Sequence, residues 1–191
     1  MHTKKEVRQS LTYHLTAEEI SNPYLLIAQF FDISDLSDHL EFLDKWKEHV
    51  LTDQVYTAEN CPANLLHEHR HILKLLEAAW LLRKAGKVSP LIFPEVKELL
   101  LERQKGELSG CFCQLNEEEL LNPYLIFRSL FQSTGLEAYR EELRDWLEES
   151  FSKEGPSFNY QDLAVTYKFL QKLFQAAWLI YNRELQMNLS Q

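Results

Sequence analysis

The chain has 191 residues, a formal net charge of −9, 45% hydrophobic residues and 12% aromatic residues. This composition is typical of a globular protein with an apolar core, and it excludes a largely disordered chain, which would contain fewer Phe, Trp and Tyr. The acidic balance argues against a nucleic acid or an anionic membrane as the main partner, and no run of about 18 apolar residues predicts a transmembrane helix.

The N-terminal region predicts a helix over residues 4–14, and no apolar signal segment follows Met1. The chain has three cysteines, Cys61, Cys111 and Cys113, which is an odd number, and a large apolar core needs no disulfide framework. We therefore expect the protein in a reducing, cytoplasmic compartment. The Cys111-x-Cys113 spacing differs from that of redox and zinc-knuckle motifs, so we expect two small apolar side chains in a connector.

Residues 15–33 predict one short helical turn followed by a longer helix. Thr16-x-x-Glu19 is a capping box, in which two side chains bind the free backbone N–H groups of a first turn, and Asn116-x-x-Glu119 is a second one in the later half of the chain. Asn22-Pro23 predicts a second cap, with proline at the first helical position, where its missing N–H costs no hydrogen bond. The helix is therefore expected to restart at Pro23.

Two more helices are predicted before the middle of the chain. Over residues 35–51 the apolar residues recur with the spacing of one helix face, and the opposite, charged face is expected to be solvated. Residues 160–185, which are apolar nearly all round, predict a buried helix. Residues 63–84 predict the corresponding helix of the first half. Its Ala78-Ala79 pair lies beside Trp80, which favours the close approach of another helix.

Residues 86–114 form a connector, in which the sequence predicts a helix from Pro94 to Lys105 that ends at Gly106. The whole chain has only five glycines, and it contains neither a glycine-rich phosphate loop nor a G-x-S-x-G nucleophile elbow. The connector therefore carries no signature of nucleotide binding or of a serine hydrolase.

The pattern of residues 15–85 recurs in the second half of the chain. Residues 15–51 and 115–151 are identical at 13 of 37 positions with an offset of 100, and residues 65–82 and 163–180 at 7 of 18 positions with an offset of 98. Both copies contain Asn-Pro-Tyr and one tryptophan in the predicted second helix. Such an internal repeat predicts a duplication, with helices over 136–151 and 160–185 in the second copy.

The fold class that follows is all-α, a tandem duplication of a three-helix unit packed as one pseudo-twofold helical domain. The single domain covers residues 1–191, with repeat 1 at 15–85, repeat 2 at 115–185 and the connector at 86–114. Each copy alone would have a thin core and a broad apolar face, so packing of the two copies against each other is favoured.

One short motif suggests catalytic chemistry. His67-Glu68-x-x-His71 resembles the H-E-x-x-H motif of zincin metallopeptidases. Residues i and i+4 of a helix lie one turn apart, so His67 and His71 would both bind zinc, and Glu68 would act as general base on the bound water. The resemblance covers five residues only. The segment that follows lacks the glycine and third histidine of a metzincin, and no strand is predicted beside it. A gluzincin takes its third ligand from a glutamate of a later helix, for which Glu95 and Glu98 lie at plausible distances. Other possible ligands are His14, His39, His49 and Cys61.

The repeat offers a different interpretation of these histidines. His67, His69 and His71 align with Val165, Tyr167 and Phe169, which are residue types of a protein core. The histidines are therefore expected to point inward and to need hydrogen-bond partners. They would be satisfied core residues, the lining of a polar cavity, or metal ligands. For Arg140 and Arg144 we expect surface ion pairs of small energy, because acidic residues surround them in the sequence.

Residues present in both copies are best explained by folding. The hydroxyls of Tyr24 and Tyr124 are expected to bond across the pseudo-twofold axis, although both tyrosines, with His69, are also candidates to line a ligand pocket between the copies. We therefore expect a non-enzymatic interaction or regulatory protein with a protein partner or a homodimer, no nucleic acid, no membrane and no cofactor. The alternative is a metal-dependent hydrolase with zinc on His67 and His71 and with Glu68 as base.

Overall fold

A computed structural model of the chain describes residues 12–52, 55–56, 62–85, 94–152 and 160–185. All regular secondary structure in these ranges is helical, which confirms the predicted all-α class. The predicted helix over 4–14 lies mostly outside the described residues, and its described end, at Tyr13 and His14, forms a turn. Within the described ranges, no helix combines the length and the apolar character that crossing a membrane requires.

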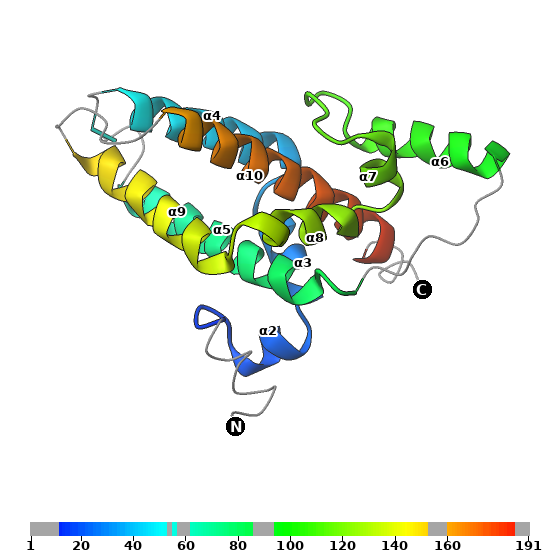
Figure 1. Cartoon of the computed structure of the whole chain (residues 1–191), viewed down its shortest axis with the longest axis horizontal. Helices are drawn as coiled ribbons and strands as arrows, with labels where there is room; N and C mark the ends of the chain where they lie inside the picture. Colours follow the sequence, from blue (N-terminus) through cyan, green and yellow to red (C-terminus); the bar gives the residue numbers. More distant parts are fainter. Residues whose placement is uncertain (1–11, 53–54, 57–61, 86–93, 153–159, 186–191) are drawn as a thin grey trace.

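The helices follow one another along the chain in an order that repeats (Figure 1). The first series is α2 (Ala17–Ser21), α3 (Tyr24–Ile33), α4 (Leu36–Leu51) and α5 (Pro62–Leu82), followed by the connector helix α6 (Pro94–Glu107). The second series is α7 (Glu117–Leu121), α8 (Tyr124–Ser133), α9 (Leu136–Phe151) and α10 (Tyr160–Ile180), which continues into a π-helical turn, η1 (Tyr181–Leu185). The helices of the two series have the same lengths of 5, 10, 16 and 21 residues.

Local sequence signals explain where these helices begin. Both predicted capping boxes are present, because Thr16 and Asn116 each accept a bond from the N–H three residues later, while Glu19 and Glu119 bond back to the cap. Each box glutamate also binds a lysine of the long helix in its own half, at 2.7 Å for Glu19 with Lys74. The boxes therefore fasten α2 to α5 and α7 to α10.

The structure shifts several predicted boundaries. Pro23 is the cap residue of α3 rather than its first helical residue, so the helix begins at Tyr24. The connector helix passes through Gly106 and ends at Glu107, because nothing at Gly106 forces a left-handed backbone. The last long helix ends as an α-helix at Ile180, and residues up to Leu185 form the π-helical turn instead.

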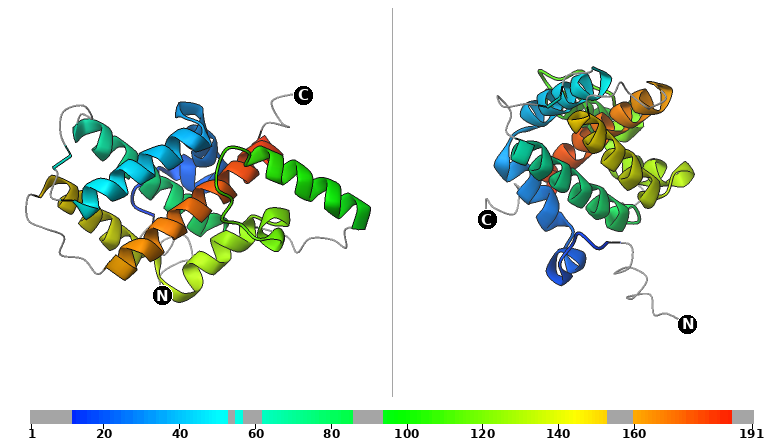
Figure 2. Two further views of the ribbon diagram at one scale, coloured as in Figure 1. Left: turned by 90° about the horizontal axis from the view of Figure 1, so that it is seen from above. Right: turned by 90° about the vertical axis from the view of Figure 1, so that its left-hand side faces the viewer.

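The long helices of the two series pack on one another (Figure 2). α5 packs on α9, α10 packs on α4, and α4 packs on α9. The shorter helices α3 and α8 cover the long helices at one end, with α3 on α5 and α8 on α10. One large apolar core results, and the two fully buried tryptophans Trp46 and Trp146 meet inside it, with ring centroids 5.4 Å apart. A second, small cluster contains Leu15, Leu26 and Ala78.

Some residues at matching positions of the sequence repeat contact each other, and others form equivalent hydrogen bonds in the two halves. The hydroxyls of Tyr24 and Tyr124 lie 2.9 Å apart. His39 Nε2 lies 2.9 Å from the carbonyl of Phe30, and Tyr139, the match of His39, donates its hydroxyl to the carbonyl nine residues before it at 3.0 Å. The same interaction of α4 with α3, and of α9 with α8, is thus made by different side chains.

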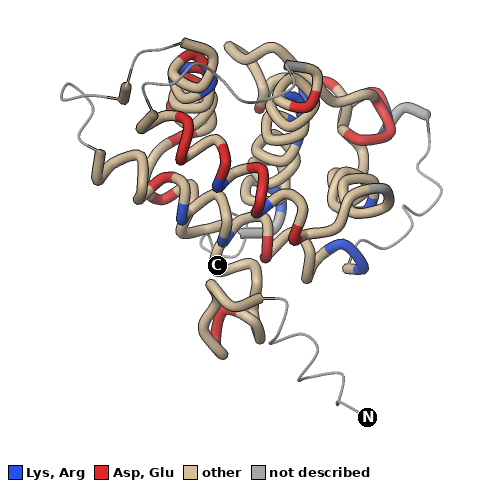
Figure 3. Tube along the Cα trace, turned by 60° about the vertical axis from the view of Figure 1, so that its left-hand side comes forward, with Lys and Arg blue, Asp and Glu red and all other residues tan. Residues whose placement is uncertain are grey.

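Helix α6 stands apart from the bundle and extends away from it (Figures 1 and 2). Its C-terminal part is held by hydrogen bonds, because Trp178 donates its indole N–H to the carbonyl of Glu107 at 3.0 Å and Arg183 donates to Gln104 at 2.9 Å. Its N-terminal part leaves two large apolar side chains in solvent, Val96 at 53% and Leu99 at 69% exposure. Charged residues of both signs are spread over all parts of the bundle (Figure 3).

Candidate functional site

The residues of the H-E-x-x-H motif lie in the first half of α5 and point in different directions. His67 and His71 lie on one side of the helix with ring centroids 4.1 Å apart, as the i, i+4 spacing predicts. His67 is exposed and His71 is half-buried. Burial lowers the pKa of His71, and neighbouring cations, with His67 first among them, lower it further. The lowered pKa favours the neutral form of the His71 imidazole, in which a ring nitrogen can bind a metal ion.

Glu68 turns toward α4. Its Oε2 atom lies 3.8 Å from Nδ1 of the buried His39, too far for a hydrogen bond, and Oε2 has no hydrogen-bond partner in the described part of the chain. Burial raises the pKa of this carboxyl group. A base in the zincin reaction would instead reach a water held by the two histidines. The role of Glu68 as a base stays a prediction.

The side chain of His69 points in a third direction, toward the centre of the bundle. Its ring lies 6.0 Å from that of Trp46, and its Nε2 atom is buried without a hydrogen-bond partner among the described residues. Burial, with a smaller contribution from His14, lowers the pKa of His69 to about 4. His69 is therefore neutral at physiological pH and behaves as a buried aromatic residue in this fold.

The expectation that all three aligned positions belong to the core is only partly right. Phe169 is buried, but Val165 is 65% exposed, and its match His67 is exposed too. The reason is position on the helix, because residues 165 and 67 lie near the start of the long helices and on the outer side. An apolar residue in a repeat therefore does not by itself indicate burial.

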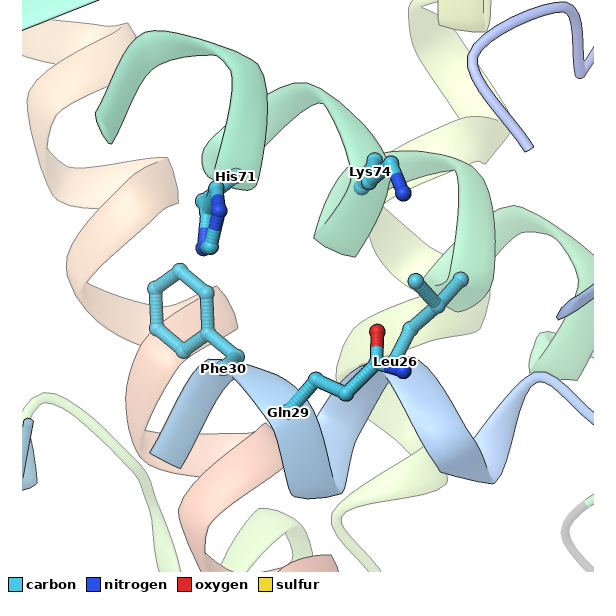
Figure 4. A pocket seen from close by; sticks show the side chains of 5 residues that line it. All are labelled: Leu26, Gln29, Phe30, His71 and Lys74. Carbon is cyan, nitrogen blue, oxygen red and sulfur yellow. The ribbon is translucent and has the colours of Figure 1, made fainter. Parts of the chain in front are cut away.

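A small pocket adjoins His71 (Figure 4). It lies between α3 and α5, with His71 and Lys74 on one side and Leu26, Gln29 and Phe30 on the other. Its volume of about 40 Å³ holds only a few water molecules. A peptide or a cofactor needs a much larger space, so this pocket fits only water or a small ion.

The described residues contain no group of three or more His, Cys, Asp or Glu side chains arranged to hold a metal ion. Cys61, a candidate ligand from the sequence, lies outside the described residues. The connector helix, whose glutamates are further candidates, packs on α7. Within the described ranges, His67 and His71 thus form a pair of potential ligands rather than a complete site.

Sequence reasoning missed a buried charged cluster between α5 and α9. Glu77 is fully buried and binds Nδ1 of His14 at 2.6 Å, and Arg140 also binds it. Tyr13 covers the guanidinium group of Arg140, with 4.2 Å between the group and the ring centroid. The expectation of a surface ion pair at Arg140 is therefore wrong, because this side chain is 4% exposed.

A second missed feature is a cleft of about 280 Å³ beside α4. One wall is a single face of α4, formed by Ser37, Leu40, Glu41 and Asp44, and the other is the turn Gly110–Phe112 with Gln171 of α10. The residues of α4 have the i, i+3, i+4, i+7 spacing of one helix face, and this spacing is the only local signal of the cleft. The turn that forms the other wall is about 70 residues away in the sequence, so the sequence gives no sign that the two walls lie together.

Comparison with protein-family models, with curated proteins and with solved structures finds no match to the chain. The functional assignment therefore depends on the surfaces and clusters described above.

Proposed function

We propose that this protein is a non-enzymatic protein–protein interaction or regulatory protein of the cytoplasm. The observation that carries the proposal is the exposed apolar surface of α6, with Val96 and Leu99 one helical turn apart and the half-buried Leu100 beside them. Phe112, in the turn that follows α6, is 80% exposed. Apolar side chains gathered on a projecting helix are typical of a surface that another protein covers.

We also propose that the chain is a tandem duplication of a three-helix unit, packed about a pseudo-twofold axis as one domain. Four pairs of helices with equal lengths, the exchanged packing of α5 on α9 and of α10 on α4, and the contact between Tyr24 and Tyr124 support it. In this arrangement α6 belongs to neither copy. Leu101 in the C-terminal half of α6 joins the core, so it is the N-terminal half, with the exposed Val96 and Leu99, that is free to serve recognition.

The proposal can be tested with a photo-cross-linking amino acid placed at Leu99 of the full chain in living cells. We expect covalent adducts of defined mass that contain a partner protein or a second copy of this chain. The matched control places the same amino acid at Glu141, an exposed residue of α9 far from α6 in sequence, where we expect no adduct of that mass.

A charged substitution at Leu99, combined with the cross-linking amino acid at Val96, tests the same surface in a second way. Leu99→Asp should abolish the adduct formed by a cross-linker at Val96, because a carboxylate cannot be buried in an apolar contact without a partner. Thermal unfolding should not change, because Leu99 is 69% exposed. Absence of an adduct at both positions, together with a mass that is independent of concentration in sedimentation experiments, would contradict the proposed function.

The alternative, a metal-dependent hydrolase, is supported by one observation, the 4.1 Å separation of the His67 and His71 rings. It can be tested by measuring the metal content of untagged protein purified without chelator. Stoichiometric zinc that is lost in His67→Ala and retained in Glu68→Ala would support this alternative. Protein without metal, together with a His67→Ala variant of unchanged behaviour, would contradict it.

A further inference from the structure

A tryptophan near the end of each long helix has the same aromatic neighbour in the two halves. Trp178 of α10 packs edge-on against Phe31 of α3, with ring centroids 5.0 Å apart. Trp80 of α5, its match in the repeat, packs edge-on against Phe131 of α8, with ring centroids 5.1 Å apart. The two tryptophans therefore mark equivalent places, and the segments that cover them can be compared directly.

In the second half of the molecule, the C-terminal part of α6 covers this place (Figure 1). α6 packs on α7, and the indole N–H of Trp178 donates to the carbonyl of Glu107, the last residue of α6, at 3.0 Å. Leu101 of α6 and Leu120 of α7 are both buried. A helix whose C-terminus meets the tryptophan thus closes the apolar surface at this end of the bundle.

The equivalent place in the first half has no such helix in the described part of the chain. α2 packs on α3 and α5 of its own half. Ile20 and Leu81 match the buried Leu120 and Leu179, but both are only partly buried. The indole N–H of Trp80 donates no hydrogen bond to any described residue. We call the surface formed by Ile20, Trp80 and Leu81 the Trp80 surface.

Three cations lie at the Trp80 surface, and their matching residues in the second half are neutral. Arg83 lies over the indole ring of Trp80, with 3.4 Å between its guanidinium carbon and the ring centroid. Arg128 of α8 donates to the carbonyl of Arg83 at 3.1 Å, and the exposed Lys84 follows Arg83 in the chain. The matching residues are Tyr181, Ala28 and Asn182. The first half therefore adds positive charge to a place that has an uncovered indole donor.

We propose that the Trp80 surface binds an amphipathic helix of a partner protein, with a C-terminal carbonyl at the indole N–H of Trp80 and acidic residues of its last turn beside Arg83 and Lys84. This inference rests on the proposed function and adds a second surface with the chemistry of its partner. Cations stabilise the C-terminus of a helix, where the helix dipole is negative, and carboxylates in the last turn add ion pairs. α6 has its own cation in its last turn, Lys105, whereas the partner helix would receive this charge from the surface.

The sequence argues against the N-terminal segment of this chain as the helix that binds here. Residues 1–11 match residues 101–111 with the offset of 100. The buried Gln104 and Leu108 then match Lys4 and Arg8, which would bring two more cations to a place that is already positive. A helix of another protein with acidic residues avoids this repulsion.

The test is an NMR titration of the isotopically labelled full chain with a peptide that has the sequence of residues 94–109 and the change Lys105→Glu, so that its last turn is acidic. We expect a saturable shift of the indole N–H resonance of Trp80. The resonance of Trp178 should not move, because its N–H is already bound to α6. The peptide with the natural Lys105 should bind about fivefold more weakly, because its cation faces Arg83 and Lys84. Equal affinity of the two peptides, or a shift confined to Trp178, would overturn the proposal.

Variants of the protein separate this surface from other places on the molecule. Lys84→Glu should weaken binding of the acidic peptide about fivefold or more, because the charge that faces the peptide is reversed. Lys168→Glu, the same change at an exposed lysine of α10, should leave binding unaltered. Trp80→Phe keeps an aromatic ring against Phe131 but removes the indole N–H, and it should also weaken binding. Equal effects of Lys84→Glu and Lys168→Glu would overturn a specific site.

A further variant tests whether the chain covers the Trp80 surface itself. Val7→Asp in the full chain, without added peptide, should leave the indole resonance of Trp80 in place. A shift of this resonance would show that residues 1–11 occupy the surface, and it would overturn the assignment to a partner protein.

The outcomes also distinguish this inference from the proposed function. If cross-linking at Leu99 captures a partner and neither peptide binds at Trp80, the protein interacts with other proteins but this inference is wrong. If the acidic peptide binds with the expected selectivity, and cross-linking amino acids at Leu99, Val96 and Lys84 form no protein adduct in cells, the surface has the proposed chemistry but the proposed function is wrong.

Discussion

The groove between α5 and α9 and the groove between α10 and α4 have the same backbone contact but different charges. In the first, Glu77 accepts the backbone N–H of His14 at 3.2 Å and also binds Arg140. In the second, Gln175 accepts the backbone N–H of Gln114 at 2.9 Å, and its amide donates to the carbonyl of Phe112 at 2.8 Å. In the first half, this contact holds the segment before α2 against α5. In the second half, it holds the segment before α7 against α10.

The difference lies in what each groove requires from its neighbours. A buried glutamate needs a cation, and Arg140 and His14 supply positive charge or hydrogen bonds, whereas a buried glutamine is satisfied by the backbone alone. The first groove is therefore closed by a charged network, which is destabilised when any one of its members is removed. The second is closed by the neutral Gln175, whose hydrogen-bond partners are backbone groups.

The largest expected effect comes from breaking the charged network. Glu77→Ala leaves Arg140 buried without its main partner, and we expect the free energy of unfolding in urea to fall by about 3–5 kcal/mol. Gln175→Ala in the neutral groove should cost about 1–3 kcal/mol. Equal losses for the two variants would show that the charges have no special role.

A paired substitution serves as the control for this experiment. The double variant Glu77→Gln with Arg140→Leu gives the first groove the residues of the second. Because both charges are removed together, its stability should lie within about 2 kcal/mol of the original protein. A loss as large as that of Glu77→Ala would mean that packing, rather than an unpaired charge, explains the single variant.

The next largest effect is a loss of stability in acid caused by buried histidines. The folded state lowers the pKa of His69 to about 4, from about 6.5 in the unfolded chain, so between these values the unfolded chain binds more protons. Stability is therefore full above about pH 6.5 and falls as the pH drops toward 4. We expect His69 alone to contribute a loss of about 2–3 kcal/mol. Burial also lowers the pKa of His39 and His71, with effects of the same sign.

His69→Tyr sharpens this comparison, because Tyr167 is the matching residue of the second half. Urea unfolding between pH 7 and pH 4.5 should show a smaller loss for this variant than for the original protein. An identical pH dependence of the two proteins would contradict the assignment of the effect to His69.

A smaller effect is expected at the two central tryptophans. Trp46 donates its indole N–H to Ser150 at 2.9 Å, whereas the indole N–H of Trp146 has no partner among the described residues, because Val50 stands at the matching position. Ser150→Val should leave a second indole without a partner and lower the unfolding free energy by about 1–2 kcal/mol. The mirror change Val50→Thr offers Trp146 an acceptor and should cost less than Ser150→Val. A larger cost for Val50→Thr would contradict this account.

The smallest effect is expected at the contact of Tyr24 with Tyr124. Removal of either hydroxyl by substitution with Phe should cost about 0.5–1.5 kcal/mol, since one hydrogen bond between the halves is lost. The double variant should cost less than the sum of the two single variants, because both act on the same bond. Strict additivity of the two changes in urea unfolding would show that the hydroxyls do not interact.

The parts of the fold that the sequence predicted depend on nearby residues. The capping boxes at Thr16 and Asn116 are confirmed because each partner is three residues away, and the helices ending at Leu51 and Phe151 follow from a regular apolar spacing. Pro23 is the cap residue of α3 instead of its first helical residue, although its backbone is already right-handed helical, with φ −63° and ψ −15°. A difference of one residue at a helix boundary is common, and sequence alone does not resolve it.

The parts that could not be predicted depend on residues far apart in the chain. Arg140 has acidic neighbours on its own helix, which indicates a surface position, but its main partner Glu77 is 63 residues away. The directions of Glu68 and His69 likewise depend on His39 and Trp46 of α4. For the H-E-x-x-H motif the spacing predicted the adjacency of His67 and His71, and it carried no information about the residues that surround them.

The exchanged packing of the long helices has a consequence for folding. Since α5 is covered by α9 and α10 by α4, a polypeptide cut within the connector gives two fragments that each lack the partner of their longest helix. Neither fragment is expected to fold in isolation, whereas a mixture of both should assemble. A lone fragment would bury the same surface only by pairing with a second copy of itself.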